Sequence, residues 1–422
     1  MRTTAGVIAR NLSWLAAGEV AVKAGLFIAG VVVARGLGAA AMGAFTVAYG
    51  AALVLMLGLA AGQVEVLIRE VARRPASARS LGREAARWQR RVALVALPLA
   101  LAACLLVPSP VLRWTLVAFV PYAFLRARLI TVGGLFKGLD RMEVEALGRT
   151  VEVVVALVLL LVATRFAAAA WSTGVTFTLG ALAGLTLVTG RLRTLAAVND
   201  DSRSSSWLAR EGAAFLALGL ASQVVLRLDT FALAALGTTE AEIGQYGVAS
   251  APVWGLLGIA PLLAAAIYPT LSRAADRGGL RAVRVIGLGL GGAALGAALG
   301  GALFALREPL VRLVFGPSYG AAVPLLGVLA WALPGAFGAM LLGVAVAACG
   351  RQAWALAWQV AALLLAGVAL LIVIPRYQLA GCALVTVGIH GASLAAMLAI
   401  AVIAVRRPAL PADVAPAAEC GQ

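Results

Sequence analysis

Six ionisable side chains interrupt the long apolar runs of this sequence, and they are the residues best suited to chemistry. Glu19 and Lys23 lie four residues apart, so on a helix they share one face and can pair. Arg227 and Asp229 lie in a second run, where Gln223 shares a helical face with Arg227. A charge inside a membrane helix costs about 2.5–3.5 kcal/mol on insertion scales, so such residues are functional candidates.

Arg126 and Arg128 complete the six. Hydropathy alone places them at the end of an apolar run, but an internal repeat with an offset of 210 aligns them with Ala336 and Gly338. Those two positions lie near the middle of an uninterrupted apolar segment, so we expect both arginines at membrane depth. Because they are two residues apart, they do not share a helical face unless Pro121 distorts the helix.

The sum of these charges favours an anionic ligand. Four basic groups against two acidic ones leave an excess of two positive charges, and the guanidinium fork of arginine fits phosphate oxygens. The candidate substrate-binding residues are Lys23, Arg126, Arg128 and Arg227. Glu19 and Asp229 are candidate gating or coupling residues. The alternative is that these charges neutralise one another between helices or extend to the lipid head groups.

Two further ionisable residues are ambiguous. Glu152 lies one turn inside an apolar run, so we expect it at the membrane interface. His390 is the only histidine and lies midway along the last apolar run. It is either a packed, hydrogen-bonded side chain or a proton-coupling group.

The composition is that of a polytopic membrane protein. Of 422 residues, 63% are hydrophobic and 12% are charged, whereas soluble proteins have about 45–50% and 25%. A membrane helix needs about 20 mainly apolar residues. Twelve segments qualify: 12–34, 41–64, 92–108, 112–136, 147–163, 167–189, 211–236, 243–268, 282–306, 321–349, 353–374 and 379–405.

The basic residues predict the orientation. The N-terminus, the loops after even-numbered spans and the C-terminus hold 24 Lys and Arg, against six in the other loops. The positive-inside rule therefore places both termini in the cytoplasm. The net charge of +16 is explained by these basic loops facing anionic lipid, so we do not expect nucleic acid as a partner.

The two halves of the chain resemble each other. Residues 34–75 align with 235–276 at an offset of 201, with Gly43 on Gly244, and Arg141 aligns with Arg351 at 210. Because each half has six spans, the repeats have parallel topology. We expect an N-terminal lobe over 1–200, a C-terminal lobe over 201–407 and a disordered cytoplasmic tail over 408–422.

Enzymatic chemistry is not expected. The chain lacks a GxxxxGK[ST] motif and a Ser–His or Cys–His grouping, and its four cysteines show no metal-binding or disulfide spacing. We therefore expect no enzyme activity, cofactor or metal site.

Several segments, in order along the chain, resemble polysaccharide-biosynthesis flippases of the Wzx type, within the MOP superfamily. They include NLSWLAAGEVAVKAGLFIAGVVVARGLGAAAMGAF, GLAAGQVEVLIREVAR, LFKGLDRME, LRLDTFALAALGTTEAEIGQYGVAS, YPTLSRAAD, LVFGPSYGAAVPLLGVLAW and IPRYQLAGCAL.

This resemblance implies a MATE-like fold of two six-helix lobes that open alternately to the two sides of the cytoplasmic (inner) membrane. It implies export of a polyprenyl-diphosphate-linked oligosaccharide, with membrane lipids and a polysaccharide polymerase complex as partners. Its motifs add Arg35 (ARGLG), Arg69 and Glu70 (IRE) as conformational or substrate contacts. Two alternatives stay open: a MATE-like drug or ion antiporter, and a non-transporting scaffold of a polysaccharide assembly complex.

Overall fold

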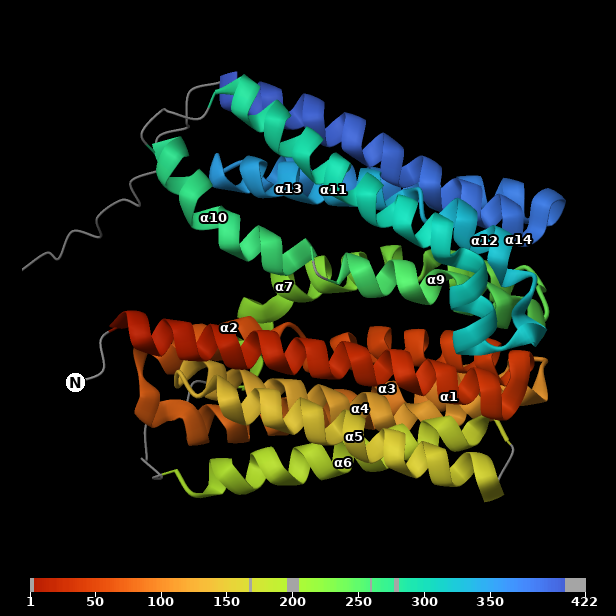
Figure 1. Cartoon of the computed structure of the whole chain (residues 1–422). Helices are drawn as coiled ribbons and strands as arrows, with labels where there is room; N and C mark the ends of the chain where they lie inside the picture. Colours follow the sequence, from red (N-terminus) through yellow and green to blue (C-terminus); the bar gives the residue numbers. More distant parts are fainter. Residues whose placement is uncertain (1–3, 167–168, 196–204, 259, 277–280, 407–422) are drawn as a thin grey trace, which may run out of the picture. The chain divides into compact units, whose positions relative to one another are not determined.

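The structure, a computed structural model, describes residues 4–166, 169–195, 205–258, 260–276 and 281–406 (Figure 1). Within these ranges the regular secondary structure is helical. In chain order the main helices are α1 (Thr4–Ala60), α2 (Gln63–Arg73), α3 (Ala78–Leu105), α4 (Pro110–Gly138), α5 (Met142–Phe166), α6 (Trp171–Arg193), α7 (Ser205–Val225), α8 (Leu228–Ala235), α9 (Glu240–Leu257), α10 (Ala260–Asp276), α11 (Ala282–Pro309), α12 (Ala322–Leu329), α13 (Ala332–Ala348) and α14 (Gln352–Arg406). Short turns η1 (Pro75–Ser77), η2 (Leu310–Phe315) and η3 (Pro317–Tyr319) complete the order.

The described helices overlap the predicted spans, but 211–236 is divided between α7 and α8, 243–268 between α9 and α10, and 321–349 between α12 and α13. In the described residues, eight helices are long and apolar enough to cross a membrane. The first and last of them contain 48 and 55 residues, enough for two crossings each. Each is divided by a residue with a positive φ angle, Gly38 at 82° and Gln378 at 48°. The chain is an all-α polytopic membrane protein, and twelve crossings are consistent with these helices.

The chain divides into two compact units. Their ranges are 1–255, 307–325 and 370–382 for the first unit, and 256–306, 326–369 and 383–422 for the second. The lobe boundaries at 200 and 407 stay a prediction, and the expected tail over 408–422 lies outside the described residues.

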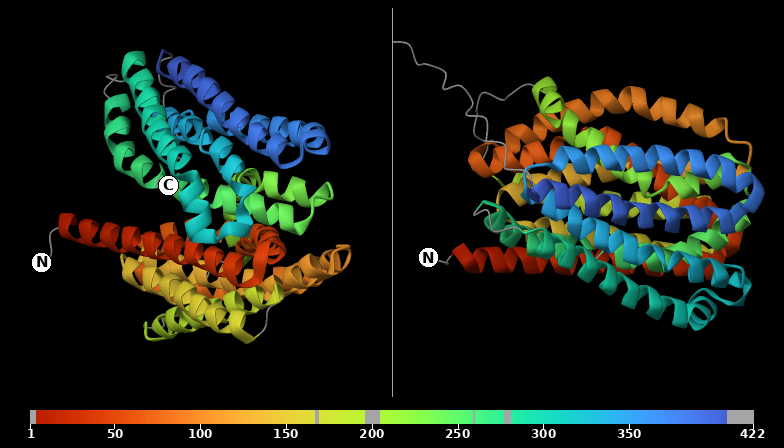
Figure 2. Two further views of the ribbon diagram at one scale, coloured as in Figure 1. Left: turned by 45° about the vertical axis from the view of Figure 1, so that its right-hand side comes forward. Right: turned by 90° about the horizontal axis from the view of Figure 1, so that it is seen from above.

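In the first unit, α1 lies beside α4 and α5 (Figure 2). Small residues allow this approach: Gly18, Gly25 and Gly36 of α1 face Ala146, Val153 and Thr164 of α5. A Cβ atom at Gly25 would lie only 2.1 Å from Cγ1 of Val153. The two backbones are therefore close enough for polar side chains on α1 to reach partners on α5.

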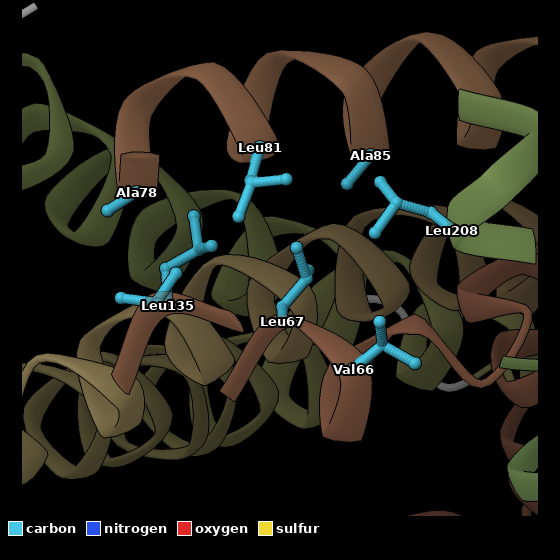
Figure 3. Packing of buried hydrophobic residues seen from close by; sticks show 8 residues of the cluster. Val66, Leu67, Ala78, Leu81, Ala85, Leu135 and Leu208 are labelled. Carbon is cyan, nitrogen blue, oxygen red and sulfur yellow. The ribbon is translucent and has the colours of Figure 1, made fainter. Parts of the chain in front are cut away.

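The amphipathic helix α2 is packed onto the rest of the first unit by its apolar face (Figure 3). The buried cluster contains Val66, Leu67 and Val71 of α2, Ala78, Leu81 and Ala85 of α3, Leu135 of α4 and Leu208 of α7. The opposite face of α2 carries exposed charges, including Arg69 and Arg73. This packing fixes the position of the IRE motif.

The repeat is confirmed at the turns that follow spans four and ten. The N–H of Arg141 donates to Phe136 at 2.9 Å, and the N–H of Arg351 donates to Val346 at 3.2 Å. These bonds are related by the offset of 210 found in the sequence. Asp140 and Gly350, at the same offset, both have positive φ angles, 56° and 71°.

At the offset of 201, repeat-related residues also contact each other inside the first unit. A Cβ atom at Gly43 of α1 would lie 1.8 Å from the carbonyl oxygen of Glu240 and 2.9 Å from the nitrogen of Gly244 on α9. A Cβ atom at Gly244 would lie 2.0 Å from the carbonyl oxygen of Ala39. The two helices therefore cross in backbone contact where Gly43 meets its own counterpart.

Candidate functional site

Span seven is interrupted at Arg227. Helix α7 ends at Val225 and α8 begins at Leu228, so Arg227 lies in the turn between them. Its guanidinium carbon lies 5.9 Å from the ring centroid of Tyr49 on α1, within the range of a cation–π interaction. Arg227 is half-buried and makes no ion pair with any residue in the described part of the chain.

Asp229 does not pair with Arg227, although it follows by two residues. Its carboxylate accepts hydrogen bonds from the Tyr246 hydroxyl at 2.7 Å and from the backbone N–H of Thr230 at 2.7 Å. Asp229 is buried, with 6% of its surface exposed. The carboxylate is thus held by neutral donors, and Arg227 is left to interact elsewhere.

A group of aromatic rings connects Arg227 to the interior of the helices that precede it. The ring of Tyr49 lies 6.0 Å from that of Tyr122 on α4, centroid to centroid. Phe45, Phe119 and Phe177 surround this pair. Tyr122 is one helical turn before Arg126, so the two tyrosines lie between the two arginines.

Arg126 is buried and forms an ion pair with Glu152 of α5. The Glu152 side chain is only 1% exposed, so it is enclosed by other helices, and its expected place at the membrane interface stays a prediction. Helix α5 begins at Met142, so Glu152 lies about 15 Å along it at 1.5 Å per residue. The span predicted from hydropathy begins at 147, five residues before Glu152, so the depth of this pair in the membrane stays a prediction.

Arg128 points to a different helix. Its guanidinium donates to Oε1 of Gln89 on α3 at 2.9 Å, and the Gln89 amide donates to Thr131 at 2.7 Å. Arg126 and Arg128 therefore contact α5 and α3, as their spacing of two residues predicts. The structure does not bring Arg128 together with the other candidate cations.

Glu19 pairs with Arg149 of α5, with 2.8 Å between Oε1 and Nη1. The expected pair between Glu19 and Lys23 does not form. Arg149 also approaches Glu145 at 3.5 Å, and Glu145 pairs with Lys137 at 3.2 Å. Close packing of α1 on α5 offers Glu19 this better partner, and Lys23 makes no ion pair with a described residue.

Arg35 lies at the end of span one that is distant from the N-terminus. It donates to the backbone carbonyls of Leu313 and Val314 in η2, the second at 2.7 Å. The hydroxyl of Tyr319 in η3 donates to the carbonyl of Ala34 at 3.0 Å. Burial raises the pKa of Tyr319 to about 12, so its hydroxyl stays protonated and remains a donor. We call these contacts of Arg35 and Tyr319 the latch.

Arg69 and Glu70 lie near the opposite end of span two. Arg69 bonds Glu70 at 3.3 Å and Glu211 of α7 at 3.0 Å. The hydrogen bond to Glu211 raises the pKa of Arg69 above its usual value. Span two from Gly38 to Ala60 extends about 33 Å, so the latch and the Arg69 pairs lie at opposite ends of one membrane span.

His390 differs from the other nine candidates, because it lies in the second compact unit. It is half-buried on α14, where a Cβ atom at Gly335 of α13 would lie 2.4 Å from its carbonyl oxygen. The helices cross closely at this histidine. In the part of the chain that is described, no group of three or more His, Cys, Asp and Glu could hold a metal ion.

Five cations and three carboxylates of the candidate site and its ion pairs again leave an excess of two positive charges. The cations are Lys23, Arg126, Arg128, Arg149 and Arg227, and the carboxylates are Glu19, Glu152 and Asp229. Two cations are neutralised in ion pairs with Glu152 and Glu19. The other three, Lys23, Arg128 and Arg227, make no ion pair with a described residue and are the cations available to an anion.

A family profile described as "Polysaccharide biosynthesis protein" matches residues 8–275, which is more than half of the chain. The chain belongs to this family. No curated protein matches it. The family assignment agrees with the resemblance found in the sequence motifs.

Solved structures of MOP superfamily transporters share the fold of this family member. The "Lipid II flippase MurJ, inward closed conformation" matches with a TM-score of 0.70 and 13% identity, over 91% of this chain and 86% of that one. The eukaryotic MATE transporter AtDTX14 matches with a TM-score of 0.64 and 13% identity, over 94% and 95%. A MOP superfamily transporter from Pyrococcus furiosus matches with a TM-score of 0.65 and 15% identity, over 95% and 94%. These relatives are transporters and flippases, and at such identities they establish the fold.

Two polar residues of this family member, Glu145 and Arg149, were missed by sequence reasoning, whereas Glu152 was identified and expected at the membrane interface. Glu145, Arg149 and Glu152 are spaced by four and three residues, so they lie on one face of α5. That spacing was the available signal. Tyr49 and Tyr122 gave none, because buried aromatic residues are common in membrane helices.

Proposed function

We propose that this chain is a flippase that moves a polyprenyl-diphosphate-linked oligosaccharide across the cytoplasmic membrane by alternating access. Both termini lie in the cytoplasm. A polar glycan does not cross hydrocarbon unaided, since each unsatisfied polar group costs several kcal/mol there. The protein shelters the sugars and the diphosphate while the lipid tail stays in the bilayer.

The observation that carries this proposal is the break in span seven at Arg227. Interrupted membrane helices mark substrate sites in transporters, because their free backbone ends and side chains face the ligand. Here the turn presents a guanidinium without a carboxylate partner among the described residues, beside two tyrosine rings. We assign Arg227, together with Arg126, to the diphosphate, and we keep Lys23 and Arg128 as candidate substrate contacts at other points of the path.

The membrane potential supports outward movement of such a substrate. An inside-negative potential contributes about 2.3 kcal/mol per charge per 100 mV, hence roughly 4–5 kcal/mol for a headgroup of charge near −2. Glu19, Asp229 and His390 are proposed to weaken binding of the diphosphate or to couple its transport to the movement of an ion. The remaining partners are membrane lipids and a polysaccharide polymerase complex.

The second candidate function is a MATE-like drug or ion antiporter, which the fold favours through its MATE neighbours. A carrier of cationic drugs needs acidic groups in its site, whereas the excess here is basic. The Pyrococcus furiosus structure is titled with "reverse polarity of binding pocket", suggesting a different function for that transporter. The third candidate, a non-transporting scaffold, predicts that substitutions in the site are silent.

Reconstituted vesicles separate these functions. We expect the purified protein to move a fluorescent polyprenyl-diphosphate disaccharide between leaflets faster than empty vesicles do, and to leave a cationic dye untransported. Vesicles with a dye gradient and the same protein serve as the matched control. Dye transport without lipid movement would favour the antiporter, and neither activity would favour the scaffold.

We further propose that Arg35 is a gating residue at the outer side and that Arg69 and Glu70 gate the inner side. The latch connects the end of span one to η2. Arg35 donates to carbonyl oxygens at the C-terminal end of η2, and these oxygens carry a partial negative charge. Opening to the outside then requires that Arg35 leave these carbonyls.

Arg35→Gln is therefore expected to favour opening at the outer side. Hydrogen bonds to a charged group are worth about 1.5–3 kcal/mol, which corresponds to roughly tenfold or more in the opening equilibrium. The reporter is Ala34→Cys, a position that is 2% exposed, in a background without the four native cysteines. An impermeant maleimide should label it at least fivefold faster in Arg35→Gln.

The control variant is Arg113→Gln. Arg113 also holds two backbone carbonyls, those of Val107 and Pro108, but it lies outside the latch. It should leave labelling of the reporter unchanged. Equal labelling in the presence and absence of the Arg35 substitution would contradict the gating role.

A further inference from the structure

The buried pair of Arg126 and Glu152 is the feature that the proposed function does not yet explain. Their side chains are 9% and 1% exposed, and they join α4 to α5 inside the first unit. A buried pair of this kind is weak evidence for stability, because desolvation offsets the attraction. The pair therefore points to a role beyond stabilising the packing of α4 on α5.

Glu152 is fixed at the closest approach of α5 to α6. A Cβ atom at Gly180 of α6 would lie 2.3 Å from the Glu152 carbonyl oxygen, and one at Gly184 would lie 3.2 Å from the Glu152 Cβ. Backbone atoms of α6 thus enclose this residue on one side. The carboxylate is a negative charge that cannot move far from its position.

Arg126 keeps unused binding capacity. Its Nε atom is buried and has no hydrogen-bond partner among the residues that the structure describes. One turn away, Tyr122 contacts Tyr49, and Tyr49 carries the Arg227 guanidinium over its ring. Arg126, Tyr122, Tyr49 and Arg227 therefore follow one another as neighbouring side chains. The members of this group are all donors suited to phosphate oxygens.

We infer that Glu152 is a positioning residue for this group: it is the resting counter-ion of Arg126 and competes with the anionic headgroup for the guanidinium. The inference rests on the proposed function and adds a residue to its site. Without substrate, Glu152 neutralises a charge that is costly at membrane depth. With substrate, the same carboxylate weakens the hold on the diphosphate, so that release is possible.

A purely bracing role leads to different expectations. If the pair only joins α4 to α5, its loss lowers the amount of folded protein and leaves the affinity of each folded molecule unchanged. If Glu152 competes with the headgroup, its loss raises the affinity for the headgroup and slows its release. The experiment must therefore measure affinity and maximal rate separately.

The first variant is Glu152→Gln. The probes are polyprenyl diphosphate for equilibrium binding in detergent, and the fluorescent polyprenyl-diphosphate disaccharide for transport in vesicles. We expect the dissociation constant to fall at least fivefold and the maximal transport rate to fall at least threefold. Glu152→Asp, which keeps the charge, should return both quantities toward the wild-type values. An unchanged dissociation constant in folded Glu152→Gln protein would overturn the inference.

The double variant Arg126→Leu/Glu152→Leu covers the case in which Glu152→Gln does not fold. Replacing both members of a buried pair by apolar residues is often neutral for stability. We expect this variant to fold and to bind polyprenyl diphosphate at least fivefold more weakly than wild type. Wild-type binding and transport would instead assign the pair to bracing alone.

The control is Glu84→Gln. Glu84 is also a buried glutamate in an ion pair, with Arg87 on the same helix α3, and it lies outside the group described above. Glu84→Gln should change neither the dissociation constant for polyprenyl diphosphate nor the maximal transport rate. If wild-type protein binds no polyprenyl diphosphate, the proposed function fails together with this inference. If wild type binds and Arg227 variants weaken binding while Glu152 variants do not alter it, the positioning role alone fails.

Discussion

Arg227→Ala is expected to lower translocation of a polyprenyl-diphosphate glycan by tenfold to a hundredfold, with normal insertion into the membrane. The substitution removes the cation at the break of span seven, which has no carboxylate partner among the described residues. Hydrogen bonds to charged groups contribute about 1.5–3 kcal/mol, and each 1.4 kcal/mol is roughly tenfold. Leaflet exchange of the fluorescent lipid in vesicles measures the loss.

Two companion variants make this test specific. Arg227→Lys keeps the charge but loses the planar fork, so it should retain an intermediate rate. Arg312→Ala removes an exposed arginine that pairs with Glu308 at 3.1 Å on a helix surface, and should leave transport unchanged. Normal transport by correctly inserted Arg227→Ala protein would remove Arg227 from the site.

Gly43→Ala is expected to destabilise the protein by about 1–3 kcal/mol or more, the range for overpacking. The added Cβ atom would lie 1.8 Å from the carbonyl oxygen of Glu240, which is backbone and cannot rotate away. Helices α1 and α9 would have to separate where they now touch. A lower unfolding temperature in detergent, together with lost transport, measures this effect.

The matched control lies on the same helix. A Cβ atom at Gly58 meets nothing within 4 Å, so Gly58→Ala should be neutral or slightly stabilising, since alanine favours helix. Gly244→Ala should reproduce the defect of Gly43→Ala from the other side of the crossing. Equal unfolding temperatures for the Gly43 and Gly58 variants would show that the helices are not in backbone contact at Gly43.

The spans and the repeat could be predicted from sequence because both depend on local information. Hydropathy over about 20 residues identified segments that fall on helices, and the offset of 210 led to two turns with the same hydrogen bonds. The left-handed residue at these turns is Asp140 in one repeat and Gly350 in the other. Because the residue types differ at these two equivalent positions, a comparison of residue identities alone does not reveal that the same turn occurs in both repeats.

Ion-pair partners could not be predicted in the same way. Lys23 is one turn from Glu19, yet Glu19 bonds Arg149, which is 130 residues away. The choice depends on the close packing of α1 on α5, a tertiary property. The break at Arg227 also lacked a signal, because neither proline nor glycine occurs between Gln223 and Asp229. The roles of the ten candidate residues stay predictions.

The meeting of Gly43 with Gly244 has a consequence for the origin of the chain. Residues on a twofold axis touch their own copies, as in an isologous interface between identical subunits. A six-helix precursor that paired with a second copy of itself would have needed only one glycine to build both sides of this crossing. In a chain made by duplication and fusion of such a precursor, either position could acquire a side chain independently of the other; here both are glycine.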